Sequence, residues 1–440
     1  MSSSLCLILF IVPLALSANN SIDSATLQNV FGNPPPAGPA LAVTPSNGTL
    51  VDPDYWDSDD NYMPKFDFML TKRLASSSSE NFLLSPLGLK LALAILTEAA
   101  TSTTQTELSS VLGFDLDRLV VRRKFAIIID SLTSKSSQYI LNLGNRIYVD
   151  DFVEPRQRFA AIAEEFYKTE LKKIDFNDAP AAAKSINAWV ANKTEGNIHN
   201  LVNEDDIQNV VVLILNTIYF KGTWRHQFAP NATKKGPFYV SASLQKPIFF
   251  MNVKDKFYYA ESAKYDAKIV RMPYLGNKFA MYVIVPNSLT GLPRVLDGLS
   301  NLRDELNYLQ EHVVDITLPR FKFDYTSSLD GVLKELGIRQ AFEDTASFPG
   351  ISRGQSLQQR LRITKVLQRS GIEVNELGSI AYSASEISLD NKFGGDSDME
   401  QEVVANKPFM FFIQDEATRQ LLFTGRVSDP SLSDGTFKSP

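Results

Sequence analysis

The sequence lacks most of the residues on which disulfide or metal chemistry depends. It holds one cysteine, Cys6, and three histidines, His199, His226 and His312, in 440 residues. The histidines stand far apart and without metal-ligand spacing, so a zinc site or a metal-dependent enzyme is not indicated. No glycine-rich phosphate loop and no nucleophile-elbow motif occurs either. An enzyme is therefore a poor fit, and we predict no metal and no cofactor.

The sequence also lacks an excess of positive charge and an apolar run of membrane length. The net charge is −6 and the isoelectric point lies near 5.4, which argues against nucleic acid as the main partner. The apolar run from Leu5 to Leu16 is too short for a membrane span but suits a signal peptide, with cleavage after Ser17. Cys6 leaves with residues 1–17. We therefore expect a secreted, disulfide-free protein that depends on a large packed core.

Residues 18–63 show no hydrophobic periodicity and are rich in proline and aspartate. We interpret them as a disordered extension that ends in an acidic patch containing Tyr55 and Tyr62. A solvated tail is the simplest interpretation, and tyrosine sulfation or an acidic docking role is the alternative. Secretion agrees with N-glycosylation sequons at Asn47, Asn192 and Asn231. A fourth sequon, at Asn19, is doubtful because it lies close to the cleavage point.

Hydrophobic patterns predict several helices and strands beyond residue 63. Ser85 and Pro86 before the apolar residues 87–96 predict a buried helix with Ser85 as its N-cap. Thr104 and Glu107 predict a capping box at the next helix. The apolar runs 210–220 and 314–323 predict strands, and 409–413 with 421–427 predict a hairpin.

The segment after Val374 combines features of a loop and of a strand. Gly378 before it, and Gly394, Gly395 and an acidic run after it, are typical of an exposed loop. Between them, small uncharged residues alternate, so a strand could bury one face without clash or unpaired charge. The alternating residues are Ser379, Ala381, Ser383 and Ser385. We infer a loop that is able to become a strand, with a flexible Ser/Ala linker as the alternative.

Several motifs resemble those of the serpins, which inhibit serine proteases. The serpin hinge is similar to Glu376, Gly378, Ser379, Ala381, Ser383, Ala384 and Ser385. Other similar motifs are 81–86, 186–190, 216–224, 318–321, 405–409 and 422–427. The resemblance implies an α+β serpin fold at residues 64–430, as a single large domain with three β-sheets and about nine helices. It further implies a tail at 431–440 and an exposed reactive-centre loop at about 376–404 that can insert into the main sheet.

The resemblance also implies a region that controls opening of the main sheet. Its members in this chain are Ser85, Asn216 and Gln368. Gly88 stands where serpins often have serine, Gln368 where many have histidine, and Leu377 where a charged hinge residue is common. We therefore expect this chain to differ from other serpins in how easily its sheet opens.

The scissile bond is indicated by two independent considerations. In inhibitory serpins it follows the fourteenth residue after the hinge glycine, which places it between Lys392 and Phe393. Lys392 is also the only basic residue between Gly371 and Lys407. Trypsin-like proteases need Lys or Arg to reach the acidic group in their specificity pocket. We predict that such a protease attacks Lys392, forms an acyl-enzyme and is trapped when the loop inserts.

Residues 391–394 are similar to the activation site of insect prophenoloxidases. This similarity indicates a secreted insect serpin that restrains clip-domain proteases of the melanisation and Toll cascades. We separately expect a monomer in a haemolymph-like fluid, without nucleic-acid or membrane partners. Some serpins bind glycosaminoglycan-like polyanions where this chain has Arg118, Arg122, Arg123 and Lys124. An ordinary solvated helix face is the alternative for that cluster. A non-inhibitory serpin acting as carrier, chaperone or storage protein is the alternative function. The small hinge residues and the basic Lys392 at the scissile bond argue against it.

Overall fold

The computed structural model describes residues 64–115, 117–133, 136–196, 198–352, 361–378 and 400–432, all within one compact unit. Its α-helices are α3 (Pro64–Ser77), α4 (Pro86–Ala99), α5 (Ser102–Leu112), α6 (Arg118–Thr133), α7 (Gln157–Tyr167), α8 (Ala179–Lys193), α9 (Leu292–Gly298), α10 (Leu302–Leu306) and α11 (Asp330–Leu336). Short 3₁₀ helices are η1 (Asp205–Ile207), η2 (Pro230–Ala232), η3 (Leu299–Asn301), η4 (Gln340–Phe342) and η5 (Pro430–Leu432). The signal peptide, the extension and residues 379–399 of the predicted loop lie outside the described residues.

The described residues also contain fourteen strands. They are β1 (Phe82–Leu84), β2 (Tyr139–Asp150), β3 (Thr169–Ile174), β4 (Val212–Gly222), β5 (Lys234–Tyr239), β6 (Gln245–Ser262), β7 (Ala267–Pro273), β8 (Phe279–Pro286), β9 (Gln310–Pro319), β10 (Phe321–Ser328), β11 (Lys365–Val374), β12 (Gln401–Val404), β13 (Phe409–Asp415) and β14 (Leu421–Val427). The predicted hairpin is confirmed, because β13 and β14 pair antiparallel from Phe409–Val427 onward.

The strands form two hydrogen-bonded networks. One has five strands in the order β10-β11-β4-β2-β3, and the other has the order β1-β14-β13-β8-β7-β6-β9-β12 with β5 added on β6. The long strand β6 pairs with β5 and β9 along residues 245–259 and with β7 along residues 258–262. The larger network therefore divides at β6 into two sheets. The expected α+β fold with three sheets and about nine helices is confirmed, with nine α-helices in the described residues.

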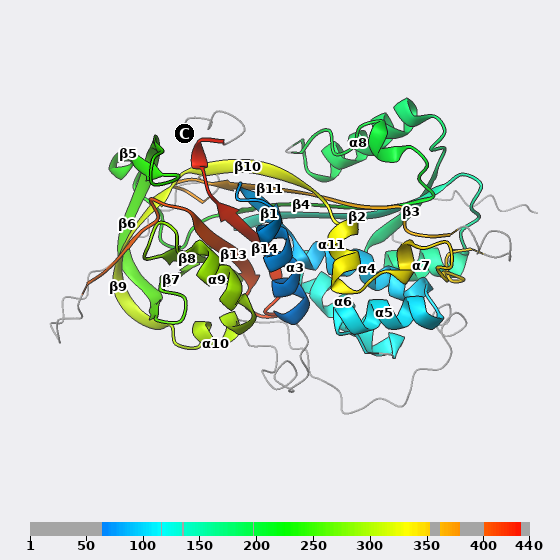
Figure 1. The fold of residues 1–440 in the computed structure, drawn as a ribbon, viewed down its shortest axis with the longest axis horizontal. Helices are drawn as coiled ribbons and strands as arrows, with labels where there is room; N and C mark the ends of the chain where they lie inside the picture. Colours follow the sequence, from blue (N-terminus) through cyan, green and yellow to red (C-terminus); the bar gives the residue numbers. More distant parts are fainter. Residues whose placement is uncertain are drawn as a thin grey trace, which may run out of the picture. The chain divides into compact units, whose positions relative to one another are not determined.

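Helices cover both faces of the five-stranded sheet. Figure 1 shows α8 on one face and α4, α5, α6 and α7 on the other. All residues of α4 are buried, as its apolar residues on every side of the helix predict. Ser85 caps this helix as expected, because its Oγ accepts a hydrogen bond from Gly88 N at 3.1 Å. The strand predicted over 210–220 is confirmed as β4, the central strand of the sheet.

The capping box predicted at Thr104 and Glu107 is wrong. Helix α5 begins two residues before Thr104, so neither side chain is in a capping position. Thr104 Oγ1 instead accepts a hydrogen bond from Ser347 N at 3.0 Å. The Glu107 carboxylate accepts from Arg339 N and Gln340 N, at 2.8 and 2.7 Å. Both side chains bind segments that are distant in sequence, which a local motif cannot reveal.

The single strand predicted over 314–323 is two strands. β9 ends at Pro319 and β10 begins at Phe321, and the two belong to different sheets. Arg320 lies between them, and its backbone N donates to Phe249 O at 3.0 Å. The apolar pattern continues across this break, so periodicity alone does not show it. Arg320 is therefore the point at which the chain crosses from the larger network to the five-stranded sheet.

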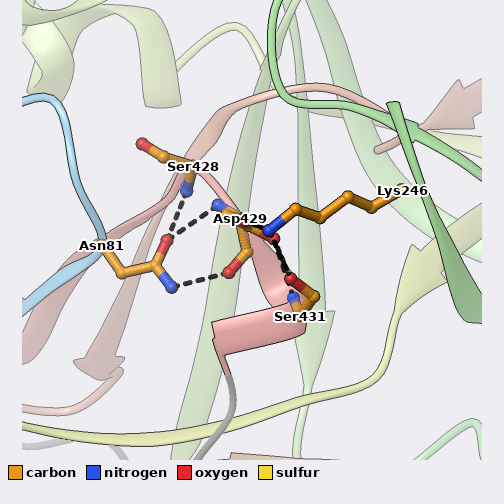
Figure 2. Close-up of polar contacts among 5 residues, drawn as sticks. All are labelled: Asn81, Lys246, Ser428, Asp429 and Ser431. Atoms are coloured by element: carbon orange, nitrogen blue, oxygen red, sulfur yellow. Dashed lines mark hydrogen bonds and ion pairs between the residues drawn. The ribbon is translucent and has the colours of Figure 1, made fainter. Parts of the chain in front are cut away.

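A polar cluster binds the C-terminal end of the described chain to Asn81 and Lys246 (Figure 2). Asn81 Oδ1 accepts hydrogen bonds from Ser428 N and Asp429 N at 2.7 and 2.9 Å, and Asn81 Nδ2 donates to Asp429 O at 2.8 Å. Lys246 Nζ donates to Asp429 Oδ2 at 2.5 Å and to Ser431 Oγ at 2.9 Å. The cluster thus joins three segments: the residue before β1, the start of β6, and η5.

The charge of Asp429 should contribute to stability. Burial opposes its ionisation, but hydrogen bonds from Lys246 and Ser431 outweigh burial and hold the pKa of the carboxyl below its ordinary value. We expect Asp429→Asn to lower the free energy of unfolding at pH 7 by about 1–3 kcal/mol, measured as a shift of the urea midpoint. A carboxyl with a depressed pKa stabilises only while ionised, so this difference should shrink as the pH falls through the folded-state pKa.

Asp297→Asn is the matched control for this measurement. Asp297 pairs with Lys72 at 2.9 Å, but its side chain is 76% exposed. Exposed pairs of this kind contribute little, so the control should leave the midpoint almost unchanged. Equal shifts for the two variants, or a pH-independent effect of Asp429→Asn, would contradict the role given to Asp429.

Candidate functional site

The five-stranded sheet contains a parallel ladder between β4 and β11, which we call the seam. It runs from the pair Lys365–Leu213 to the pair Ile372–Phe220. The strands beyond it, β10 on one side and β2 on the other, pair antiparallel with their neighbours. Parallel pairing is slightly less stable per residue than antiparallel pairing. The seam is therefore slightly less stable per residue than the ladders on either side of it.

The three residues of the predicted sheet-opening region form one buried cluster at the seam. Gln368 Oε1 accepts a hydrogen bond from Ser85 N at 2.6 Å, and Gln368 Nε2 donates to Ser85 O at 2.9 Å. Gln368 Nε2 also donates to Asn216 Oδ1 at 2.7 Å, across the seam. Moving β11 away from β4 must break that bond, and a buried amide left unpaired costs about 1–3 kcal/mol. The role of the cluster in sheet opening stays a prediction.

Two of the three departures from the usual serpin pattern, Gly88 and Gln368, meet at Asn216. Gln368 binds it directly, and a Cβ on Gly88 would lie only 2.3 Å from Asn216 Oδ1. Asn216 also donates through Nδ2 to Asn145 Oδ1 of β2, at 2.7 Å. Sequence reasoning missed Asn145. The only feature that could have marked it is an amide side chain buried within a predominantly apolar strand. The cluster thus links β11, β4 and β2 beneath the start of α4.

A hinge turn (residues 375–378) follows β11 and is held by the chain that follows β4. Three hydrogen bonds hold it: Phe228 N to Glu376 O (3.0 Å), Trp224 N to Leu377 O (3.2 Å) and Trp224 Nε1 to Asn375 O (3.0 Å). Gly378 has a φ of +81°, and a Cβ there would lie 2.4 Å from Gly222 O. Glycine is therefore required at this turn, both for its backbone angle and for the close approach.

The Glu376 side chain ties the hinge turn to two further segments. Its Oε1 accepts a hydrogen bond from Thr233 Oγ1 at 2.6 Å and pairs with Arg320 Nη1 at 3.2 Å. The residue is 8% exposed, so these contacts are largely shielded from water. Thr233 precedes β5, and Arg320 lies at the crossing between the two networks. Sequence reasoning missed both partners because they lie far from Glu376 in the chain.

An aromatic pair supports the hinge turn. Trp224, which donates two of the hydrogen bonds, stacks on Tyr274 with ring centroids 4.4 Å apart and planes at 11°. Both rings are buried, and burial raises the pKa of the Tyr274 hydroxyl well above its ordinary value. Rigid stacking of two buried rings gives the donors a defined position. The hinge turn is thus bound to an ordered surface.

The segment after α8 covers the seam on the face opposite α4 and is attached to β11. Arg369 Nη1 donates to Asn200 O at 2.7 Å. Lys365 Nζ pairs with Asp206 Oδ1 at 2.7 Å. Burial opposes ionisation of Asp206, but the bonds from Lys365 and the backbone outweigh it, so the pKa of this carboxyl lies below its ordinary value. A strand that enters the seam must therefore displace this cover or carry it along.

Several predicted site residues lie outside the described part of the chain. They are Ser379, Ala381, Ser383, Ala384 and Ser385 of the hinge, the reactive bond Lys392–Phe393, and the sequons at Asn19 and Asn47. The other two sequons are described, and Asn192 and Asn231 are both exposed. Thr233, the hydroxyl residue of the Asn231 sequon, is the residue that binds Glu376. Asn231 therefore lies close to the hinge turn.

The basic residues predicted for polyanion binding do not share one surface. Arg122 is 8% exposed and binds Glu98 through two hydrogen bonds of 2.8 Å. Arg118 donates to Ala100 O at 2.8 Å, whereas Arg123 is exposed. A polyanion site on α6 would therefore have to form without the Arg122 side chain, which is held against α4.

The histidines occupy separate places. His226 pairs with Asp255 at 2.6 Å, and His312 packs edge-on against Tyr259. Among the residues that the structure describes, no group of three or more His, Cys, Asp or Glu side chains is placed to hold a metal ion. Within the same described ranges, no helix has the length and apolar character needed to cross a membrane.

Comparisons with known proteins agree in pointing to one family. A family model described as serpin (serine protease inhibitor) matches residues 61–430. Serine protease inhibitor 2 of Anopheles gambiae is 37% identical over 376 residues, covering 83% of this chain and 91% of that protein. Serine protease inhibitor 42Dd of Drosophila melanogaster is 30% identical over 361 residues, covering 81% of this chain and 93% of that protein.

Solved structures show the same likeness. Serpin48 of the insect Tenebrio molitor, described as a highly specific serpin, aligns with a TM-score of 0.75 at 28% identity. That alignment covers 87% of this chain and all of the other. Uncleaved ovalbumin aligns with a TM-score of 0.76 at 27% identity, covering 84% of this chain and 99% of the other.

The Gly88–Asn216 contact can be tested with matched alanine variants. Gly88→Ala should push Asn216 away from Gln368 and lower the free energy of unfolding by about 1–3 kcal/mol, measured by urea denaturation. Gly331→Ala in α11 is the control, because nothing lies within 4 Å of a Cβ built there. The control should gain stability, by up to about 1 kcal/mol, from higher helix propensity. A stabilising effect of Gly88→Ala would contradict the tight packing at the seam.

Proposed function

Because the chain belongs to the serpin family of serine protease inhibitors, we propose that it traps trypsin-like proteases through cleavage at Lys392–Phe393 and loop insertion. The seam and the hinge turn are the structural support for this mechanism. The observation that carries the proposal is that β11 and β4 are neighbouring strands that run parallel.

The parallel direction of the seam favours insertion of one particular strand. A chain that turns back after β11 runs antiparallel to β11, and therefore also antiparallel to β4. Placed between them, it would replace one parallel ladder with two antiparallel ladders. Such a strand would bind the backbones of both neighbours along its length and gain hydrogen bonds on each side. The closed seam thus has a lower-energy alternative that is built from the same chain.

The register of that strand follows from the hinge turn. With residues 375–378 as the connection, the pairs would be Ser379–Val374, Ala381–Ile372, Ser383–Ser370 and Ser385–Gln368. The four β11 partners are at most 2% exposed, so the small alternating residues would face the buried side of the sheet. No charge is buried by this register. Ser385 would arrive beside Gln368 and Asn216, where a hydroxyl can satisfy the amides that separate when the seam opens.

Cleavage supplies the freedom that insertion needs. The protease serine attacks the Lys392 carbonyl carbon, the Lys392–Phe393 bond breaks, and the new amine leaves on Phe393 while the ester stays on Lys392. Before cleavage, the far end of the loop is held because β12 pairs with β9 from Gln401–Val314 to Val404–Thr317. After cleavage, residues 379–392 stay joined to the rest of the inhibitor only through the hinge turn, while Lys392 carries the protease. The intact protein is therefore kinetically trapped in this proposal.

The similarity of residues 391–394 to a prophenoloxidase activation site supports a narrower target class. We propose insect clip-domain proteases of the melanisation and Toll cascades as the physiological targets. The Anopheles gambiae and Drosophila melanogaster relatives support an insect setting. A non-inhibitory serpin that acts as carrier, chaperone or storage protein is the second candidate. The glycine and the small residues of the hinge favour the inhibitor, because insertion requires them.

Trapping is tested by mixing the protein with trypsin. We expect a covalent 1:1 complex that survives SDS, a released peptide that begins at Phe393, and a cleaved protein that melts at a higher temperature than the intact one. Lys392→Ala should abolish the complex with trypsin by removing the group that fills the acidic pocket. Cleavage without a complex would support the carrier, and a protease that stays fully active would exclude inhibition.

Two further proteases make this test specific. Chymotrypsin and a recombinant clip-domain protease are added to the panel at equal concentrations. The narrower proposal expects the clip-domain protease to be trapped at least as fast as trypsin, and chymotrypsin much more slowly. Trapping of trypsin without trapping of the clip-domain protease would leave the inhibitor established and reject the target class.

We also propose that the protein is secreted after loss of residues 1–17 and carries glycans on Asn47, Asn192 and Asn231. Contact with glycosaminoglycan-like polyanions is proposed through the exposed Arg123. Enzymatic deglycosylation should increase the electrophoretic mobility of the secreted protein, and Asn231→Gln should reduce that change by one step. Asn231→Gln is preferable to Thr233→Ala, because the latter would also remove the hydrogen bond to Glu376. An N-terminus at Met1 and unchanged mobility would reject this proposal.

A further inference from the structure

Phe249 is an aromatic residue at the surface of β6 whose contacts lead to the hinge turn. It is 48% exposed, so a large part of its ring faces solvent instead of the core. The Cζ atom of Arg320 lies over this ring, 5.0 Å from its centroid. The backbone of the same two residues is joined as well, because Arg320 N donates to Phe249 O at 3.0 Å. Phe249 thus holds Arg320 at both its backbone and its guanidinium group.

Arg320 connects Phe249 to the hinge turn. Its Nη1 lies 3.2 Å from Glu376 Oε1, and its side chain is 22% exposed. The carboxylate that it holds belongs to the residue whose carbonyl accepts the hydrogen bond from Phe228 N. A surface ring, a cation and the hinge turn therefore form a continuous series of contacts. The series crosses from the larger network to the end of β11.

The chemistry of this series depends on an aromatic ring. A guanidinium group is planar and stacks on an aromatic face, where the ring quadrupole attracts it. The ring also restricts the side-chain rotamers of Arg320, which reduces the entropy lost when it pairs with Glu376. A leucine at position 249 would keep much of the apolar contact but would provide no quadrupole. The ring should therefore matter to the hinge turn in a way that apolar area does not explain.

The neighbouring charges do not replace this arrangement. Lys235 lies opposite Phe249 on β5 and is exposed. Lys322, on the strand that follows Arg320, pairs with Glu373 at 3.0 Å. Glu376 is thus held by the cation that stacks on Phe249, while the nearest lysine of β10 binds a different carboxylate.

We propose that Phe249 is a positioning residue for the hinge turn. Its ring orients the Arg320 guanidinium toward Glu376 and thereby slows the release of residues 375–378 from the chain after β4. If the loop inserts as proposed above, release of the hinge turn precedes entry into the seam. Phe249 then sets how long the uncleaved protein keeps its inhibitory form. This kinetic consequence rests on the proposed function, whereas the positioning role does not.

Amide hydrogen exchange of the intact protein tests the positioning role directly. The amides of Trp224 and Phe228 donate to carbonyls of the hinge turn, so their exchange reports its release. We expect Phe249→Leu, and likewise Phe249→Met, to exchange about two- to fivefold faster at these amides, as loss of a surface cation–π contact implies. Phe249→Tyr keeps an aromatic face and should exchange at the wild-type rate.

Two controls distinguish the loss of the Phe249 ring from a general loosening of β6. Tyr258 lies on the same strand, is 46% exposed and stacks with Arg271 at 5.7 Å. Tyr258→Leu makes the same chemical change away from Glu376 and should leave the Trp224 and Phe228 amides unchanged. In an Arg320→Gln background, Phe249→Leu should add nothing further, because the residue through which it acts is gone.

The proposal fails if the tyrosine and leucine variants exchange alike, or if the leucine effect persists in the Arg320→Gln background. A second measurement connects positioning to inhibition. During incubation at a fixed temperature without protease, Phe249→Leu should lose trypsin-trapping activity two- to fivefold faster than Phe249→Tyr. If the wild-type protein traps no protease, the proposed function fails, but the exchange experiment still decides the role of Phe249.

Discussion

The parallel ladder between β4 and β11 is the constraint on which the rest of the structure depends. Its backbone pairing is complete, yet it has less favourable geometry than the antiparallel ladders on either side. The centre of the sheet is therefore a ladder that is slightly less stable per residue than its two neighbours. The bond from Gln368 to Asn216 strengthens this ladder with side chains, and the packing of Gly88 on Asn216 leaves that bond little freedom.

The seam and the hinge turn are held by different kinds of contact. The seam depends on buried amides and on a glycine that permits close approach of α4. The hinge turn depends on its backbone carbonyls and on one carboxylate, which is bound by one cation and one hydroxyl from segments outside the five-stranded sheet. Contacts of the second kind lie nearer to solvent, so they should open first. This order would let the end of β11 become mobile while the centre of the sheet is still closed.

The sequence correctly predicted those elements whose own residues show the apolar pattern of a buried helix or strand. The buried helix α4, the central strand β4 and the β13–β14 hairpin are of this kind. It failed where the deciding contact is distant: Thr104 and Glu107 bind chain more than two hundred residues away, and the break at Arg320 follows from pairing with β6. Arg122 was assigned to a surface because its partner, Glu98, lies on another helix.

The same limit applies to the site. Ser85, Asn216 and Gln368 came from resemblance to a family, and the structure adds their geometry. Asn145 and Thr233 carry no local pattern that marks them, because each gains its place through a contact between separate segments. Trp224 and Arg320 lie within the similar motifs 216–224 and 318–321, but those motifs do not report that both residues bind the hinge turn. Residue spacing within one strand or helix cannot report such contacts, whereas a resemblance reports only those residues that the family shares.

The position of β13 and β14 has a consequence for biosynthesis. These strands come late in the chain, yet they lie inside the larger network, between β1 and β8. While the ribosome is still making them, β1 and β8 each lack the neighbour against which they finally pair. Folding of that sheet must therefore wait until residue 427 has left the exit tunnel, and the unfinished chain exposes two unpaired strand edges that chaperones would have to protect.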